Sequence, residues 1–237
     1  MTRIDSYEDL ADNIVGWLKD YYWMHNVKAF VVGVSGGIDS AVVSSLCART
    51  GLPTYVVCMP LESKFENTKL SDAHSKALVE KYDNVKRIEV ELFSAYDSLI
   101  KSIEWWSEAQ HFDRKEFTSS DHAKANTKSR MRMVTLYQIA GSVGGIVVGT
   151  GNKVEDYGVG FYTKYGDGGV DIAPIADLYK TEVWELGEYL EVDQRIVDAD
   201  PTDGLWIDSR SDEEQLGASY AEPVSYTHLT LPTNKAV

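Results

Sequence analysis

Hydrophobic and polar positions along the chain follow two periods, one typical of amphipathic helices and one of short buried strands. Near the N-terminus, Leu10, Ile14, Leu18 and Tyr21 recur at helical spacing, and Ser6 precedes them as a candidate N-cap. Further along, short apolar runs bounded by turn residues predict strands. The pattern predicts strands at 28–34, 54–59, 85–92 and 145–150, and further helices at 38–49, 66–82, 93–106, 125–142 and 177–190, the last capped by Asp177.

The alternation of strands with helices decides the expected fold class. Parallel strands need a crossover, which is usually a helix, and right-handed crossovers place helices on both faces of the sheet. We therefore expect an α/β fold, a doubly wound parallel sheet with helices on both faces. One domain is expected over residues 1–222.

The last residues differ in composition from the rest of the chain. Residues 224–237 contain no Asp or Glu and one Lys, after a strongly acidic stretch. The string VSYTHLTLPT resembles the translation of a transposon end used in sequencing libraries. We expect 223–237 to be a non-native tail and the natural C-terminus of the domain to be truncated.

The turn between the first predicted strand and the next helix has the features of a phosphate site. Ligands of parallel sheets lie at the carboxyl ends of strands, and here the strand ends in Ser35-Gly36-Gly37. Glycines let the backbone approach a ligand, and the following helix adds the positive end of its dipole. Asp39 would repel phosphate unless Mg²⁺ lies between them. The alternative is a tight strand-to-helix turn without a ligand.

Charge and cysteine content narrow the function classes. The formal net charge is -14, which disfavours binding to nucleic acid or to an anionic membrane. No apolar run approaches the length of a membrane span. The two cysteines form no CxxC pair, so we expect neither a disulfide framework nor a zinc site, and we expect a cytoplasmic protein.

Two further segments carry candidate binding residues. The segment 147–183 is long and rich in Gly, Asp and Lys, and loops of that length in a compact domain are usually functional. The predicted helix 125–142 carries a basic cluster that includes Lys128, Arg130 and Arg132. Such a cluster in an acidic chain suits a dianionic ligand, whereas ordinary solvated helix charges are the alternative.

The string SGGIDS resembles the SGGxDS signature of the ATP pyrophosphatase, or PP-loop, family. No Gly-Lys-Ser/Thr or GxGxxG motif is present at this turn, so neither a Walker A loop nor a dinucleotide fingerprint is indicated. Residues 1–222 resemble ammonia-dependent NAD synthetases of that family, most strongly at 33–40 and 126–183 and again at 200–220. The resemblance implies an adenine nucleotide alpha-hydrolase-like fold and cleavage of ATP between its α- and β-phosphates.

The resemblance also implies roles for individual residues. Asp39 and Lys180 would be catalytic, and Asp39 and Glu155 would hold Mg²⁺. Arg130, Lys164 and Asp171 would contact deamido-NAD. The family's C-terminal His-Lys pair has no counterpart in this sequence. ATP would be bound by Gly33, Val34, Ser35, Gly36, Gly37, Ile38, Asp39, Ser40, Thr150, Lys180 and Thr202.

The implied reaction is amidation of deamido-NAD to NAD with ammonia, through an adenylated carboxyl, with release of AMP and pyrophosphate. No glutaminase domain is recognisable, so free ammonia is the expected nitrogen source. Relatives imply a homodimer. Two alternatives stay open at this point: a tRNA-modifying PP-loop enzyme, and a nucleotide-binding module without catalysis. The acidic charge opposes the first, and the paired acids Asp39 and Glu155 oppose the second.

Overall fold

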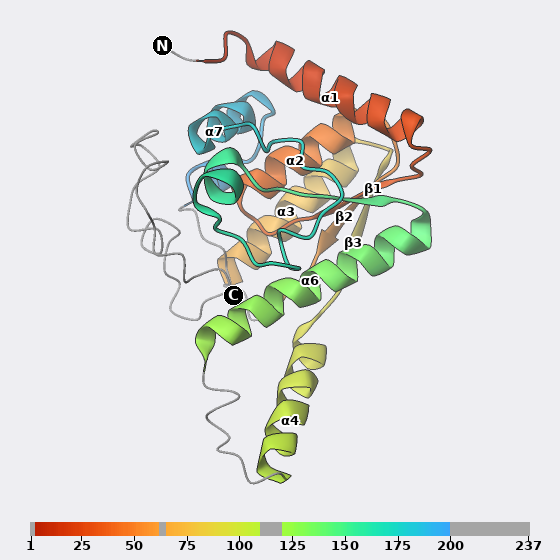
Figure 1. Cartoon of the computed structure of the whole chain (residues 1–237). Helices are drawn as coiled ribbons and strands as arrows, with labels where there is room; N and C mark the ends of the chain where they lie inside the picture. Colours follow the sequence, from red (N-terminus) through yellow and green to blue (C-terminus); the bar gives the residue numbers. More distant parts are fainter. Residues whose placement is uncertain (1–2, 62–64, 110–119, 200–237) are drawn as a thin grey trace.

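A parallel four-stranded sheet forms the centre of the described chain. The computed structural model describes residues 3–61, 65–109 and 120–199 (Figure 1). The strand order is β3-β2-β1-β4, so the chain adds strands to one side of β1 and then returns to its other side. This reversal of strand order next to β1 is the position at which doubly wound sheets bind ligands. The strands are β1 (Phe30–Gly33), β2 (Thr54–Cys58), β3 (Val85–Glu89) and β4 (Ile146–Val148).

The predicted helices are present, α2 with the predicted ends and the others with shifted ends. Ser6 caps the first helix as predicted, since its side chain accepts a hydrogen bond from the Asp9 amide at 3.1 Å. The prediction that Asp177 caps the last long helix is wrong, because that helix begins at Lys180 with Tyr179 as its N-cap. The helices are α1 (Tyr7–Met24), α2 (Ile38–Arg49), α3 (Phe65–Lys81), α4 (Phe93–Ala109), α6 (Asp121–Val143), α7 (Lys180–Tyr189) and α8 (Gln194–Val197).

A π-helical segment, η1 (Lys153–Val159), lies inside the region predicted as one long loop. A single wide turn of this kind has no apolar repeat that sequence periodicity could detect. Asn152 caps it, because the side-chain oxygen accepts hydrogen bonds from the amides of Val154 and Glu155 at 3.0 and 3.1 Å.

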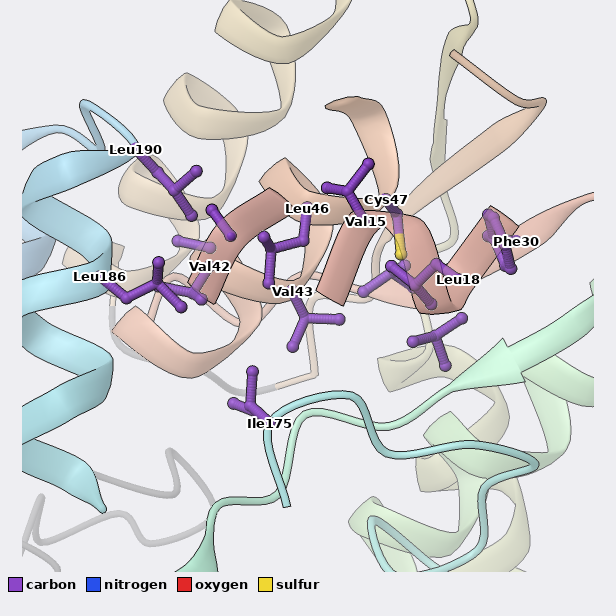
Figure 2. Packing of buried hydrophobic residues seen from close by; sticks show 14 of the residues in the cluster. Val15, Leu18, Phe30, Val42, Val43, Leu46, Cys47, Ile175, Leu186 and Leu190 are labelled. Atoms are coloured by element: carbon purple, nitrogen blue, oxygen red, sulfur yellow. The ribbon is translucent and has the colours of Figure 1, made fainter. Parts of the chain in front are cut away.

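Alternate residues of β1 point into two apolar cores, which confirms helices on both faces of the sheet. Phe30 and Val32 join a core with Leu18 of α1 and Leu46 of α2. Figure 2 shows side chains of α1, α2 and α7 meeting there. Val31 joins a second core on the opposite face with residues of α6. In Figure 1, α1, α2 and α7 lie above the strands and α6 crosses below them. The β1 strand is therefore packed on both faces of the sheet, and this packing holds the turn at its carboxyl end in place.

His74 of α3 is a buried titratable group between α3 and α2. Its Nε2 lies 2.9 Å from the Ser44 hydroxyl, and burial lowers the pKa of His74 to about 4. The unfolded state, with an ordinary pKa of about 6.5, therefore binds a proton that the folded state excludes between these values. The free energy of unfolding should fall as the pH drops from about 6.5 to 4, by up to about 1.4 kcal/mol per pH unit from this group.

Urea denaturation of the wild type and of His74→Gln across this pH range tests that expectation. Glutamine does not titrate, so the variant should lose less stability on acidification than the wild type does. Two parallel stability curves would contradict the assignment, because carboxylates elsewhere in the protein would then account for all of the pH dependence.

Candidate active site

The turn between β1 and α2 has the form expected of an anion-binding loop. Gly36 has a φ of 92°, a left-handed conformation that favours glycine. The Ser40 hydroxyl accepts from the Ser35 amide at 3.1 Å and donates to the Gly37 carbonyl at 2.9 Å. Ser71 of α3 donates to the Val34 carbonyl at 3.0 Å. Gly37 is the N-cap of α2. No side chain therefore caps the first turn of this helix, and the turn faces the loop as in helix N-termini that bind anions.

Asp39, Glu155 and Lys180 meet beside this loop, although 141 residues separate Asp39 from Lys180. The Lys180 ammonium lies 2.6 Å from Asp39 Oδ2 and 3.0 Å from Glu155 Oε1. The Lys180 side chain is 3% exposed. These three side chains, which we call the acid–lysine cluster, come from the first turns of α2, η1 and α7. The sequence-predicted catalytic and metal-binding residues are therefore brought together.

The acid–lysine cluster holds more negative than positive charge. Burial alone would lower the pKa of Lys180, but the carboxylates of Asp39 and Glu155 raise it above its ordinary value, so the ammonium stays charged. Burial raises the pKa of the Asp39 carboxyl, and the charge of Lys180 opposes that rise. Burial also raises the pKa of neighbouring Asp156 to about 7, and the charges of Asp167, Glu155 and Asp39 add to this effect. The cluster thus favours a further cation.

Sequence reasoning missed one residue that holds the cluster in place, Asn152, and one that packs beside it, Gly151. Asn152 is fully buried, and its amide donates to Asp39 Oδ1 at 3.1 Å while its oxygen caps η1. Asn152 therefore fixes Asp39 relative to the segment that carries Glu155. Gly151 lies against Asp156, and a Cβ there would lie 1.8 Å from Asp156 Oδ2, so a larger residue would displace that carboxylate. The signal for Asn152 is its residue type, since Asn favours the position before a helical turn.

The predicted deamido-NAD contacts divide into a pair and a separate residue. Arg130 of α6 donates through Nε to the Lys164 carbonyl at 3.0 Å, so these two predicted residues are neighbours. Asp171 instead accepts from the Val147 amide at 2.8 Å and from the Tyr137 hydroxyl at 3.0 Å. In this structure Asp171 thus joins β4 to α6.

The remaining predicted positions are less informative. Thr150 lies two residues past the carboxyl end of β4, and β4 is the neighbour of β1 in the sheet. Thr202 lies outside the described residues. Lys128 of the basic cluster on α6 is buried, and its ammonium lies 5.5 Å from the ring centre of Tyr96.

Metal binding to this site would need ligands beyond its protein side chains. Within 3–61, 65–109 and 120–199, no group of three or more His, Cys, Asp or Glu side chains could hold a metal ion.

None of the helices in the described part of the chain has the length and the apolar composition of a membrane span.

Comparison with known proteins shows the family of this chain. The sequence model of the NAD synthase family matches residues 10–231. The NH(3)-dependent NAD(+) synthetase of Alkaliphilus metalliredigens is 37% identical over 211 residues, which cover 89% of this chain and 82% of that protein. The corresponding protein of Carboxydothermus hydrogenoformans is 35% identical over 218 residues, with coverage of 92% and 84%.

A solved structure extends the likeness to the fold. The NMN synthetase from Francisella tularensis superposes with a TM-score of 0.80 at 33% identity, covering 92% of this chain and 84% of its own. The parallel sheet, the glycine turn and the match along most of the chain therefore agree, and the chain belongs to the NAD synthase family.

Proposed function

We propose that the protein converts deamido-NAD to NAD with ATP and ammonia, and releases AMP and pyrophosphate. The observation that carries this proposal is the buried Lys180, which two carboxylates hold beside a glycine turn at the switch point of the sheet. Relatives that share this chain's family are named NAD synthetases. The alternatives, a tRNA-modifying enzyme and a non-catalytic module, have no comparable support.

The first step joins the substrate to AMP. A carboxylate oxygen of deamido-NAD forms a bond to the α-phosphorus of ATP, while the bond from that phosphorus to the bridging oxygen breaks and pyrophosphate leaves. The loop amides and the Lys180 ammonium are fixed donors that stabilise the negative charge developing on the phosphate oxygens. Ammonia then attacks the activated carboxyl carbon, AMP leaves with the transferred oxygen, and a proton is lost from nitrogen.

Mg²⁺ fits the acid–lysine cluster, with Asp39 and Glu155 as the residues that would hold it. The ion commonly takes one or two carboxylates and completes its coordination with phosphates and water. These two carboxylates already share one cation, the Lys180 ammonium, and their charge exceeds it. When bound, Mg²⁺ would supply neutralisation of the phosphate charge.

Arg130 and Lys164 are the residues that we propose for the deamido-NAD contact. Arg130→Ala should raise the KM for deamido-NAD about tenfold to a hundredfold, the value of one lost charged hydrogen bond. The KM for ATP should change much less. Steady-state kinetics with each substrate varied in turn measure both constants, and Lys124→Ala on the same helix serves as the control. An equal rise in both constants would remove Arg130 from this role.

We further propose a cytoplasmic homodimer. Free thiols at Cys47 and Cys58 agree with a reducing compartment. The helix α4 carries exposed apolar side chains that include Leu99, Ile103 and Trp105, the last 71% exposed, and exposed apolar surface often marks an interaction site.

A charge at Trp105 of α4 should separate the subunits. Trp105→Glu should shift the protein from dimer to monomer, because a carboxylate buried in an apolar interface is unpaired. Sedimentation equilibrium measures the mass of each species. Trp23→Glu on α1, where the side chain is 69% exposed, is the matched control and should leave the mass unchanged. A monomeric wild type, or a dimeric Trp105→Glu variant, would contradict the proposal.

Pyrophosphate release tests the proposed reaction. The protein is mixed with ATP, Mg²⁺, ammonium and deamido-NAD, and each component is then omitted in turn. We expect continued release only in the complete mixture, and at most one pyrophosphate per enzyme site when ammonium alone is omitted, because adenylation precedes the attack of ammonia. A parallel arm replaces deamido-NAD with nicotinic acid mononucleotide, because one similar structure is named an NMN synthetase. Release with unmodified tRNA alone, or no release in any arm, would favour one of the alternatives.

A further inference from the structure

Arg3, at the start of the described chain, is bonded to the segment that carries Lys180. Its Nε donates to Glu182 Oε1 at 2.9 Å and its Nη2 donates to Glu182 Oε2 at 2.6 Å. Nη2 also donates to the Asp177 carbonyl at 2.8 Å. The guanidinium thus forms a bidentate ion pair with the Glu182 carboxylate, and its bond to the Asp177 carbonyl fixes the backbone just before α7.

Glu182 in turn fixes the start of α7. Its Oε2 accepts from the Tyr179 amide at 2.8 Å, and Tyr179 is the N-cap of the helix. The first amides of a helix have no partner within it, so a carboxylate in the first turn stabilises that end. Glu182 is buried, and it lies in the same helical turn as Lys180, the first residue of α7. The contact of Arg3 therefore reaches the turn from which Lys180 projects.

Tyr179 also connects Arg3 with the segment that carries Glu155. The Arg3 guanidinium carbon lies 5.1 Å from the centre of the Tyr179 ring, and the Lys153 ammonium lies 5.0 Å from it. The Lys153 amide donates to the Leu178 carbonyl at 2.9 Å. Lys153 begins η1, two residues before Glu155. The Arg3 side chain therefore contacts the segment that carries Lys180 directly, and it contacts the segment that carries Glu155 through the Tyr179 ring.

We propose that Arg3 is a positioning residue for Lys180: through Glu182 and Tyr179 it holds the first turn of α7 where the ammonium reaches both Asp39 and Glu155. The inference rests on the proposed function, because the position of Lys180 affects turnover only if Lys180 acts on ATP. The Arg3 side chain is 46% exposed, so its ion pair adds little to global stability. Displacement of a reacting group by about 1 Å can cost a hundredfold in rate. Loss of Arg3 should therefore affect turnover more than stability.

Three variants test this role. Arg3→Ala removes the guanidinium, and Arg3→Lys keeps the charge without the fork. Lys81→Ala is the matched control, because Lys81 forms an exposed ion pair with Glu191, just past the other end of α7. We expect kcat to fall about tenfold in Arg3→Ala, with Arg3→Lys intermediate and Lys81→Ala within about twofold of the wild type. The KM for deamido-NAD should stay constant.

Hydrogen exchange followed by mass spectrometry gives a readout that does not depend on activity. Amides of residues 179–183 should exchange faster in Arg3→Ala, and they should be unchanged in Lys81→Ala. Unchanged exchange in Arg3→Ala, a wild-type kcat in that variant, or an equal loss of kcat in Lys81→Ala would each overturn the proposal. A wild type that releases no pyrophosphate would overturn the proposed function instead, while hydrogen exchange would still decide whether Arg3 holds the first turn of α7.

Discussion

Asp39→Asn should leave the fold intact and lower NAD formation by about a hundredfold to a thousandfold, the scale of losing one electrostatic group at a reacting centre. Asparagine has the shape of aspartate, so its oxygen can still accept from Asn152, which now donates to Asp39 at 3.1 Å. The substitution removes one of the two charges that hold Lys180 and that would hold Mg²⁺. Steady-state turnover at saturating ATP, with circular dichroism as a check of folding, measures the effect.

The matched control for Asp39→Asn is Asp12→Asn. Asp12 pairs with Arg49, the last residue of α2, at 3.6 Å, whereas Asp39 lies in the first turn of the same helix. Asp12→Asn should turn over normally. Near-wild-type turnover of Asp39→Asn at saturating Mg²⁺ would exclude Asp39 from the site.

Lys180→Met should destabilise the protein by about 3–5 kcal/mol, because it removes a buried ammonium that offsets the charge of two partly buried carboxylates. Both Asp39 and Glu155 contact this ammonium, and the lysine side chain is 3% exposed. Chemical denaturation measures the free energy of unfolding. Lys81→Met, at an exposed ion pair, should cost at most about 1 kcal/mol.

Combining Lys180→Met with Asp39→Asn separates this repulsion from lost packing. If like charges cause the instability, the double variant should be more stable than Lys180→Met alone, because Asp39→Asn neutralises one of the two carboxylates that repel each other. Equal stability of the single and double variants would attribute the loss to packing of the lysine stem.

The pattern of apolar residues was sufficient for the sheet and the long helices because each of them buries apolar side chains in one of the cores. The helix predicted at 38–49 is α2, which buries nearly all of its residues against β1 and α7. Periodicity failed at η1, because that turn is held by Asn152, whose amide is bonded to Asp39 across 113 residues of sequence. Such a contact exists only once the sheet has formed.

The residues of the candidate site could be predicted from the sequence, but only some of their contacts could. The resemblance selected Asp39, Glu155 and Lys180, and the structure brings them together. It also selected Asp171, whose carboxylate accepts from the Val147 amide because residue 172 bridges β4 at Val148. The role of Asp171 toward deamido-NAD stays a prediction, since in this structure its two carboxylate oxygens accept from the Val147 amide and the Tyr137 hydroxyl.

Transfer of isotope from substrate to AMP tests the central claim most directly. Deamido-NAD labelled with ¹⁸O in its nicotinate carboxylate is incubated with the wild-type protein, ATP, Mg²⁺ and ammonium, and the products are analysed by mass spectrometry. Attack of the carboxylate on the α-phosphorus predicts one ¹⁸O atom in each AMP, none in pyrophosphate, and one AMP for each NAD formed. Unlabelled AMP, or label in pyrophosphate or inorganic phosphate, would contradict adenylation of the carboxyl group at this site.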